Sequence, residues 1–324
     1  MLIIDNQKFF QIISKFKIKS YSQTEGWLSF CDFEEKGNII FLVDEILNPQ
    51  IACYGHVKKA LGFKMLLMEG PCIKSEDYKY ALIKGFYDEI TKLDFDMVEI
   101  NSSIKYKPEY EIGIRRAGYL RPVGFFSIQL SNWINLQENL HYNSNWKRNI
   151  KKSEDYNLSF EVQSKPTKEK VKEVVDFYNS FTKEKGISHQ LYFTSTYNML
   201  QSNDFSLGIV YDSKSSMTSC IIFHYNDQHA GLLYAAKNNQ AKDSGATFFM
   251  YNQLLELLKT RGLKTFDMEK LQPSTHSTDG VFLFKDGIKG EHIVYNGEWC
   301  WYKKSIYRLM MYFVKKYLMK KSER

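Results

Sequence analysis

The stretch Thr265–Gly287, TFDMEKLQPSTHSTDGVFLFKDG, gives the clearest indication of the fold of this chain. It predicts a strand, Thr265–Glu269, and a short helix that ends near Gly287. The amphipathic helix Gly245–Arg261 precedes it, and the strand Glu291–Tyr302 follows it. Three apolar, β-rich runs lie further upstream: Leu207–Tyr211, Met217–Tyr225 and Gly231–Lys237. The C-terminal half is therefore predicted to contain several strands, a helix, a strand, a short helix and a last strand.

The N-terminal half has the same order of elements about 170 residues earlier, which indicates an internal repeat. Phe95-Asp96-Met97 corresponds to Phe266-Asp267-Met268, and Gly118 corresponds to Gly287. The predicted elements of this half are the strands Ile39–Ile46, Ile51–Val57 and Lys64–Ile73, the helix Ser75–Leu93, the strand Phe95–Asn101, a short helix ending at Gly118, and the strand Phe125–Leu130.

We therefore predict an α/β protein of the α+β type with two tandem domains, residues 1–157 and 158–324. A chain of 324 residues exceeds what one hydrophobic core usually supports. Each domain is expected to have a mixed, mostly antiparallel sheet flanked by helices. The two are expected to face each other across a cleft, where ligand sites preferentially lie. The basic, helical segment Glu138–Asn157 connects them, and Lys168–Lys185 forms a further amphipathic helix.

Composition narrows the class of protein. Hydrophobic residues make up 44% of the chain and aromatic residues 15%, which is ample material for a core. The N-terminus lacks a signal-peptide pattern, and no apolar run has membrane-spanning length. The five cysteines have no CxxC spacing, so we expect no disulfide framework and no metal site. These features predict a cytoplasmic protein, and nothing resembles a dedicated DNA-binding motif.

The net charge of +7 is concentrated in the connector and in the C-terminal tail. The tail, from Lys303 onward, has an apolar stripe at helical spacing and lysines on most of its other face. Two interpretations stay open: a terminal helix docked on the protein body, or an interfacial helix on anionic lipid at the inner membrane face.

The order of elements in each half resembles the GNAT acyltransferase fold, and its duplication resembles the FemABX family of aminoacyl transferases. The stretch Gly280–Glu291 is similar to the family's Gly-Leu-x-x-Phe-Lys-x-Gly-Phe-Gly-Gly pattern. Phe266–Glu269 stands at its Tyr-Asp-Phe-Gly-Gly strand end, and Val294–Glu298 at its Tyr-x-Gly-Glu. Gln23–Trp27 and the basic helix Trp146–Lys152 also fit. By this resemblance, Phe284 and Lys285 lie at the reaction centre and help to bind the donor or stabilise transition-state charge.

The sequence departs from the family pattern after Asp267. Met268-Glu269-Lys270 stands where the pattern has glycines, which changes the backbone freedom and the charge of this site. The paired-helix insertion of some aminoacyl-tRNA-dependent members is absent. The resemblance therefore leaves the donor open, between a coenzyme A thioester and aminoacyl-tRNA.

A short loop before the helix Gly245–Arg261 bears on this choice. GNAT enzymes hold the coenzyme A pyrophosphate there, on backbone N–H groups at a helix N-terminus. The residues predicted for this role are Lys242, Ser244, Gly245, Ala246 and Thr247. Ser244 is equally well explained as an ordinary helix cap. The loop favours a coenzyme A thioester as the donor.

Amine acylation needs a proton acceptor, because only the neutral amine attacks a carbonyl. Asp267 and Glu269 end a strand and are the best candidates, although either fits a capping or ion-pair role equally well. His276 is a further candidate base. A backbone N–H of the strand Leu232–Ala236 is expected to stabilise the oxyanion, as GNAT similarity implies. Two interpretations of Tyr234 on this strand stay open: it protonates a leaving thiolate, or it packs in the core, which is the default role of a tyrosine.

The acceptor is expected to carry phosphate, which arginine and lysine bind well. We assign its phosphates to Arg148, Lys151 and Lys152. Trp27 and Trp146 are candidates to stack on its base or sugar, and filling of the domain interface is the alternative for either one. The sequence thus predicts an N-acyltransferase that acts on a nucleotide-linked amino sugar in cell-envelope polysaccharide synthesis, without a covalent intermediate. Two alternatives remain: an aminoacyl-tRNA-dependent enzyme that extends a peptidoglycan precursor, and a non-catalytic membrane- or glycolipid-binding module.

Overall fold

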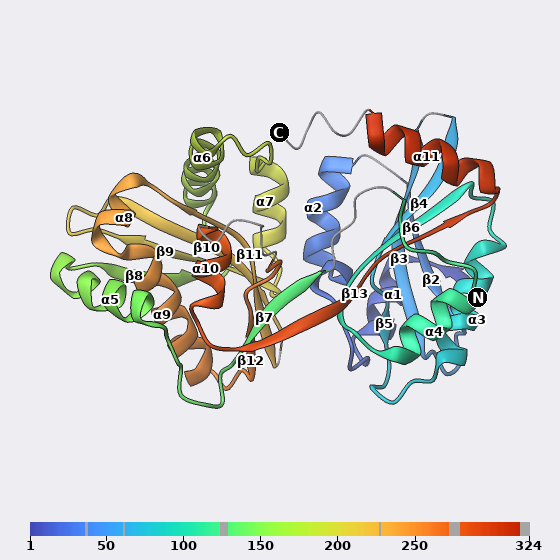
Figure 1. Cartoon of the computed structure of the whole chain (residues 1–324), viewed down its shortest axis with the longest axis horizontal. Helices are drawn as coiled ribbons and strands as arrows, with labels where there is room; N and C mark the ends of the chain where they lie inside the picture. Colours follow the sequence, from blue (N-terminus) through green and yellow to red (C-terminus); the bar gives the residue numbers. More distant parts are fainter. Residues whose placement is uncertain (36–37, 61, 124–128, 227, 272–278, 318–324) are drawn as a thin grey trace. The chain divides into compact units, whose positions relative to one another are not determined.

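The computed structural model describes residues 1–35, 38–60, 62–123, 129–226, 228–271 and 279–317. The chain divides into two compact units, neither of which is contiguous in sequence (Figure 1). Unit 1 contains residues 1–24, 35–129 and 294–324, and unit 2 contains residues 25–34 and 130–293. The fold class predicted from the sequence, a mixed and mostly antiparallel sheet with helices in each of two tandem parts, is confirmed.

Unit 1 is built on a sheet with the strand order β1-β2-β3-β4-β6-β13, and β5 pairs with β3. Only β4 and β6 are parallel. The strands are β1 (Leu2–Ile4), β2 (Asn38–Val43), β3 (Ile51–Ala60), β4 (Phe63–Glu69), β5 (Cys72–Ile73), β6 (Met97–Lys105) and β13 (Glu291–Tyr302). The helices are α1 (Asn6–Ile13), η1 (Tyr21–Gln23), α3 (Tyr80–Thr91), α4 (Pro108–Arg116) and α11 (Ser305–Tyr317).

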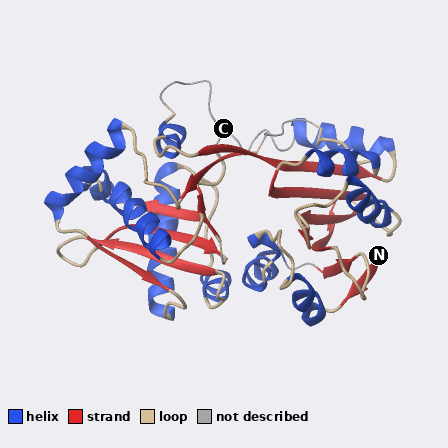
Figure 2. Cartoon of the chain, turned by 90° about the horizontal axis from the view of Figure 1, so that it is seen from below, coloured by secondary structure: helices blue, strands red, loops and turns tan. Residues whose placement is uncertain are grey.

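Unit 2 has the strand order β7-β12-β11-β10-β9-β8, with β11 and β12 parallel. Figure 2 shows helices on both sides of this sheet. The strands are β7 (Leu130–Asn135), β8 (Ser159–Gln163), β9 (Phe205–Tyr211), β10 (Met217–Tyr225), β11 (His229–Lys237) and β12 (Thr265–Asp267). The helices are α2 (Glu25–Glu35), α5 (Ser144–Ser153), η2 (Glu154–Tyr156), α6 (Lys168–Lys185), α7 (Phe193–Leu200), α8 (Asn239–Ser244), α9 (Ala246–Thr260) and α10 (Gly280–Asp286).

The two units exchange their closing strands. β7 follows α4 of unit 1 in the chain, yet it pairs with β12 of unit 2. β13 follows α10 of unit 2, yet it pairs with β6 of unit 1 over most of its length. The observed division therefore differs from the predicted boundary between residues 157 and 158, because local sequence patterns do not show which sheet a strand joins. Most of the predicted strand Phe125–Leu130 lies outside the described residues.

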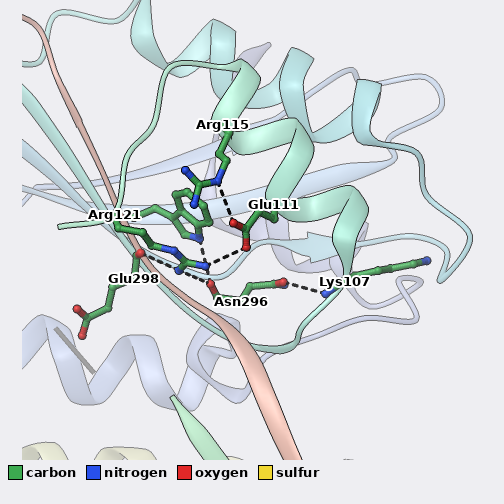
Figure 3. A network of polar contacts seen from close by, with 7 residues as sticks. Lys107, Glu111, Arg115, Arg121, Asn296 and Glu298 are labelled. Carbon is green, nitrogen blue, oxygen red and sulfur yellow. Dashed lines mark hydrogen bonds and ion pairs between the residues drawn. The ribbon is translucent and has the colours of Figure 1, made fainter. Parts of the chain in front are cut away.

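A polar network in unit 1 fixes β13 to the neighbouring elements (Figure 3). The Arg121 guanidinium donates to the backbone oxygens of Asn296 and Glu298 at 2.8 and 3.0 Å, and to Glu111 at 3.1 Å. It also lies 3.7 Å from the ring centroid of Trp299, a cation–π distance. Trp299 is fully buried. The exchanged strand is thus part of the core of unit 1.

Helix α2 is a further segment that belongs to unit 2, although the residues before and after it in the chain belong to unit 1. A Cβ atom on Gly26 would lie 2.3 Å from Ser202 Oγ and 2.7 Å from the Phe205 ring, so the helix backbone packs tightly against the start of β9. Both neighbours belong to unit 2. No helix among the described residues is long and apolar enough to cross a membrane.

Candidate functional site

The candidate site of unit 2 lies where the pairing of β11 and β12 ends. The last paired residues are Gly231 and Asp267, and β11 continues to Lys237 with only β10 beside it in the described sheet. On the β10 side the register shifts between Ile222, opposite Tyr234, and Phe223, opposite Leu232. Leu233 is therefore an extra residue in β11, a β-bulge of the kind often found next to active sites.

The chain turns sharply after β12, and two residues there have a left-handed backbone. Glu269 has φ of 50° and Lys270 has φ of 30°. These are the positions where the family pattern has two glycines, so the turn keeps a glycine-like backbone with charged side chains in place. The ammonium group of Lys285 donates to the backbone oxygens of both residues, at 3.2 Å for Lys270. One lysine thus holds the turn from helix α10.

Helix α10 delivers Lys285 from a well-anchored position. Its N-terminus is capped by Asp279 Oδ1, which accepts from the backbone N–H groups of Val281 and Phe282. Phe284 packs against the unit 2 core, and its backbone oxygen accepts from Trp146 Nε1 at 2.8 Å. Burial lowers the pKa of Lys285 to about 8, although the nearby carboxylates Glu269 and Asp267 act in the opposite direction. The lysine therefore titrates near physiological pH.

Asp267 holds the same turn from the strand side. Its Oδ1 atom accepts a hydrogen bond from Ser131 Oγ and another, at 2.8 Å, from the Glu269 backbone N–H. Ser131 lies on the exchanged strand β7, so no local sequence signal could have indicated it. The structure gives Asp267 a positioning role. Its predicted role as general base remains a prediction.

The Glu269 carboxylate lies near a histidine that the sequence analysis missed. Glu269 Oε1 is 4.0 Å from His224 Nε2, and both side chains are largely buried. Burial, with the charge of His229 as a smaller cause, lowers the pKa of His224 to about 3. His224 is therefore neutral at physiological pH, and the contact is not an ion pair. Gly231 makes room for the imidazole, because a Cβ atom there would lie 2.3 Å from Nε2.

An aromatic cluster lies on β11 beyond the bulge. The ring of Tyr234 stacks on His189, with centroids 5.1 Å apart, and contacts Tyr178 and Phe30. Tyr178 Oη is 3.2 Å from His189 Nδ1. Burial lowers the pKa of His189, and the positive charge of Lys270 contributes. Tyr234 is thus on β11, beyond the residues that pair with β12, and its role toward a leaving group stays a prediction.

The predicted pyrophosphate loop forms the junction between α8 and α9. Gly245 has φ of 71°, and a Cβ atom there would lie 2.4 Å from the backbone oxygen of Asn149 in α5. Ser244, Gly245 and Ala246 are buried, and Ser244 Oγ donates to the Gln240 backbone oxygen. Helix α5 therefore closes over the start of α9. Of the remaining residues predicted for this role, Lys242 is exposed on α8, and Thr247 Oγ1 is 3.4 Å from Ser219 Oγ.

The predicted acceptor residues fall into two groups. Arg148, Lys151 and Lys152 are exposed on α5 and are available to an anionic ligand. The prediction that Trp146 stacks on a ligand is wrong, because this side chain is fully buried between Tyr142, Phe248 and Phe284. Tryptophan in a basic helix looks the same in sequence whether it faces the core or a ligand.

The predicted roles of two further residues, Trp27 and His276, stay predictions. Trp27 is partly buried on α2 and stacks on Phe30, with ring centroids 5.2 Å apart. His276 lies outside the described residues. Among the residues that are described, no cluster of side chains could hold a metal ion.

Comparison by sequence finds no relative: no protein-family model and no curated protein matches the chain. Comparison by structure finds proteins with a similar fold. FemX matches with a TM-score of 0.75 and 11% identity, over 96% of this chain and 100% of FemX. L-PGS from Bacillus licheniformis matches at 0.66 and 13%, over 95% and 96% of the two chains. A tandem GNAT protein from the clavulanic acid biosynthesis pathway matches at 0.54 and 8%, over 93% and 97%. The chain therefore has a FemABX-like, tandem GNAT-type fold, as its sequence predicts.

Proposed function

We propose that this chain transfers an acyl group from an activated carrier to a primary amine, at the end of β12 in unit 2. The observation that carries the proposal is the open edge of β11 beyond Gly231, bulged at Leu233. Backbone N–H groups on such an edge suit a carbonyl oxygen that gains negative charge. The carboxylate of Glu269 belongs to the adjoining turn, and Lys285 of α10 donates a hydrogen bond to this turn.

The proposed step forms a C–N bond and breaks the bond between the carbonyl carbon and the carrier oxygen or sulfur. The amine attacks, its proton passes to a base for which Glu269 is the first candidate, and the leaving group takes up a proton. Lys285, as a cation, donates to the developing oxyanion. A cysteine nucleophile is disfavoured, because burial raises the pKa values of Cys72 and Cys220 to about 12. We therefore propose direct transfer, without a covalent enzyme intermediate.

Two donors fit this chemistry, and the structure bears on the choice. The loop Lys242–Thr247 led us to expect acyl-CoA. Helix α5 packs closely against this turn, because a Cβ atom on Gly245 would lie 2.4 Å from the Asn149 backbone oxygen. This contact favours a donor without a pyrophosphate at that place, such as the aminoacyl ester of a tRNA. The loop sequence and this contact thus favour different donors; acyl-CoA remains our first candidate, and aminoacyl-tRNA is the second.

For the acceptor we propose an amine on a phosphate-bearing cell-envelope precursor, with a nucleotide-linked amino sugar as the first candidate. The exposed cations Arg148, Lys151 and Lys152 support this choice, because they form a positive face on α5 that no carboxylate of that helix neutralises. A peptidoglycan precursor carries phosphate as well and is the second candidate.

The donor is tested first by binding. Thermal unfolding of the full chain is followed with short acyl-CoAs, with aminoacyl-tRNA and with uncharged tRNA, because a ligand of the native state raises the melting temperature. A screen of nucleotide-linked amino sugars with the stabilising donor is then read by mass spectrometry, which detects the acylated amine directly. The proposal is wrong if no donor stabilises the chain and no acylated product forms.

The site assignment is tested by Lys285→Ala. Removing one donor to an oxyanion typically costs about 100- to 1,000-fold in kcat, so we expect a loss of this size without loss of the fold. Lys289→Ala is the matched control, since Lys289 is an exposed lysine four residues away. Lys285→Arg keeps the charge at high pH, so the decline of activity above pH about 8 should move to higher pH. Unchanged turnover in Lys285→Ala would exclude this site.

A further inference from the structure

Helix α11 of unit 1 carries two apolar stripes, and only one of them faces the protein. Tyr307, Met311 and Val314 are partly buried and lie on one side of the helix. Tyr307 packs edge-on against Phe63 of β4, with ring centroids 4.9 Å apart. The inward stripe accounts for the contact of the helix with unit 1, and the second stripe needs another explanation.

The second stripe is exposed and continuous. Its residues follow the spacing i, i+3, i+4, i+7 and i+11, which places them on one side of a helix. They are Ile306, Leu309, Met310, Phe313 and Tyr317, with exposed fractions of 52, 51, 44, 48 and 63%. Scattered apolar residues are normal on protein surfaces, whereas a contiguous stripe usually marks an interaction site.

The charges around this stripe identify its partner. Residues 303–321 contain seven lysines and arginines and no aspartate or glutamate. Lys316 borders the stripe on the helix, Arg308 lies on another side of the helix, and Lys304 directly precedes its first residue. A carboxylate from another segment, Asp94, pairs with Lys303 at 3.3 Å, and it neutralises only the end of this surface.

We propose that α11 lies in the surface of an anionic membrane, with its exposed stripe among the acyl chains and its cations at the headgroups. An apolar face flanked by lysine, arginine and aromatic residues is the pattern of such interfacial helices. A second copy of the chain is a poorer partner, because a symmetric pair would bring two cationic helices together. A helix of 13 residues lies on the membrane rather than crossing it.

The test uses the full chain and does not depend on the proposed reaction. Flotation is measured with vesicles of phosphatidylcholine alone and of phosphatidylcholine with 30 mol% phosphatidylglycerol (about a physiological anionic content). We expect flotation with the anionic vesicles only, weakened by added salt. Absence of flotation with the anionic vesicles overturns the proposal.

Two pairs of variants separate the stripe from general surface properties. Leu309→Ser with Phe313→Ser should weaken binding at least tenfold, whereas the control Leu47→Ser with Ile112→Ser, also exposed apolar residues of unit 1, should not. Lys304→Gln, Arg308→Gln and Lys316→Gln should weaken binding more than the equally charged change Lys15→Gln, Lys17→Gln and Lys19→Gln.

Equal loss in the variants of α11 and in their controls would show that binding is non-specific and would overturn the proposal. The oligomeric state is measured by light scattering for the parent chain and for Leu309→Ser with Phe313→Ser. A dimer that this double change dissociates would assign the stripe to a second copy and would also overturn it.

Discussion

Glu269 and Lys270 show how a single turn combines backbone strain with chemistry. Residues other than glycine in a left-handed conformation typically cost about 1–3 kcal/mol each, and they persist where the surroundings fix them. Here Asp267 accepts from the Glu269 N–H while Lys285 donates to the carbonyl oxygens of Glu269 and Lys270. The strained turn carries the carboxylate of Glu269 and the cation of Lys270, where glycines would supply no side chain.

The burial of Lys285 predicts a pH-dependent contribution to stability. Its pKa is about 8 in the folded chain, below the ordinary 10.5, so the folded chain loses this proton at lower pH than the unfolded chain. Between these values the unfolded state binds more protons, and the contribution of Lys285 to the free energy of unfolding rises with pH. Lys285→Met should remove that rise, by about 1 kcal/mol between pH 7.5 and 9.5.

Urea unfolding of the parent chain and of Lys285→Met at the two pH values measures the difference. Other groups titrate in this range, so only the comparison of the two proteins is informative. Lys289→Met is the control, and it should follow the parent chain. A difference between Lys285→Met and the parent that does not change with pH would show that Lys285 is not buried as described.

Lys285, Asp267 and Glu269, which the sequence singles out by local patterns, lie close together in the structure, whereas residues brought there by pairing between distant strands were missed. Lys285 and Asp267 follow from motifs in one stretch of chain. Ser131 and His224 reach the site from β7 and β10, and nothing near them in sequence marks them. Trp146 was misassigned because a helical pattern does not show which face is covered.

Among the elements, the junction of α5, α8 and α9 is where the sequence predicts the pyrophosphate of a donor to bind. The positive φ of Gly245 lets the chain pass from α8 into α9, and the missing side chain lets the Asn149 carbonyl approach. A substitution such as Gly245→Val would disturb this packing, so a loss of donor binding in that variant would not show that the loop holds a phosphate. A comparison with a second glycine of positive φ, Gly186, separates the cost of the left-handed backbone from the cost of the clash with α5.

Gly245→Ala should lower the free energy of unfolding by about 2–4 kcal/mol, since left-handed strain of about 1–2 kcal/mol is joined by a backbone clash. Gly186→Ala, which ends α6 at φ of 65° with nothing within 4 Å of its Cβ position, should show the strain alone. Chemical denaturation of both variants gives the comparison. Equal losses would mean that α5 yields at no cost, and the start of α9 would again be available to a pyrophosphate.

Most elements were predictable because their periodicity is local. β10, α6 and β13 have the predicted bounds, and α9 differs by one residue at each end. The predicted strand Lys64–Ile73 is two strands, β4 and β5, separated by Gly70-Pro71, because proline cannot donate a ladder hydrogen bond. The short helices α7 and α8 were not predicted. Their sequences are brief, and packing on neighbouring elements decides their conformation.

For the whole molecule, the exchange of β7 and β13 determines which parts of the chain complete each core, which the repeat alone does not show. Trp299 on β13 completes the core of unit 1, and Trp146, carried by α5 after β7, completes the core of unit 2. Each unit thus depends on chain from the other half of the sequence. The repeat is visible in the sequence because it preserves local order, while the exchange changes only the pairing of strands.

The exchange predicts that neither half of the sequence folds alone. Residues 1–157 lack β13, and residues 158–324 lack α2, β7 and α5. Each fragment should show no cooperative unfolding by circular dichroism and should expose apolar surface, whereas co-expression of the two should restore a cooperative transition. A fragment that unfolds cooperatively by itself would show that its unit does not need the exchanged strand.

The exchange also constrains the ancestry and future of such a gene. A duplication that keeps each copy self-contained can be undone, because deletion of one copy leaves a working ancestor. Once closing strands are traded, deletion or recombination at the midpoint leaves two incomplete sheets with open edges, which are prone to aggregate. The two copies must then be inherited together. Each copy can diverge in sequence only as far as its exchanged strand still pairs with the sheet of the other unit.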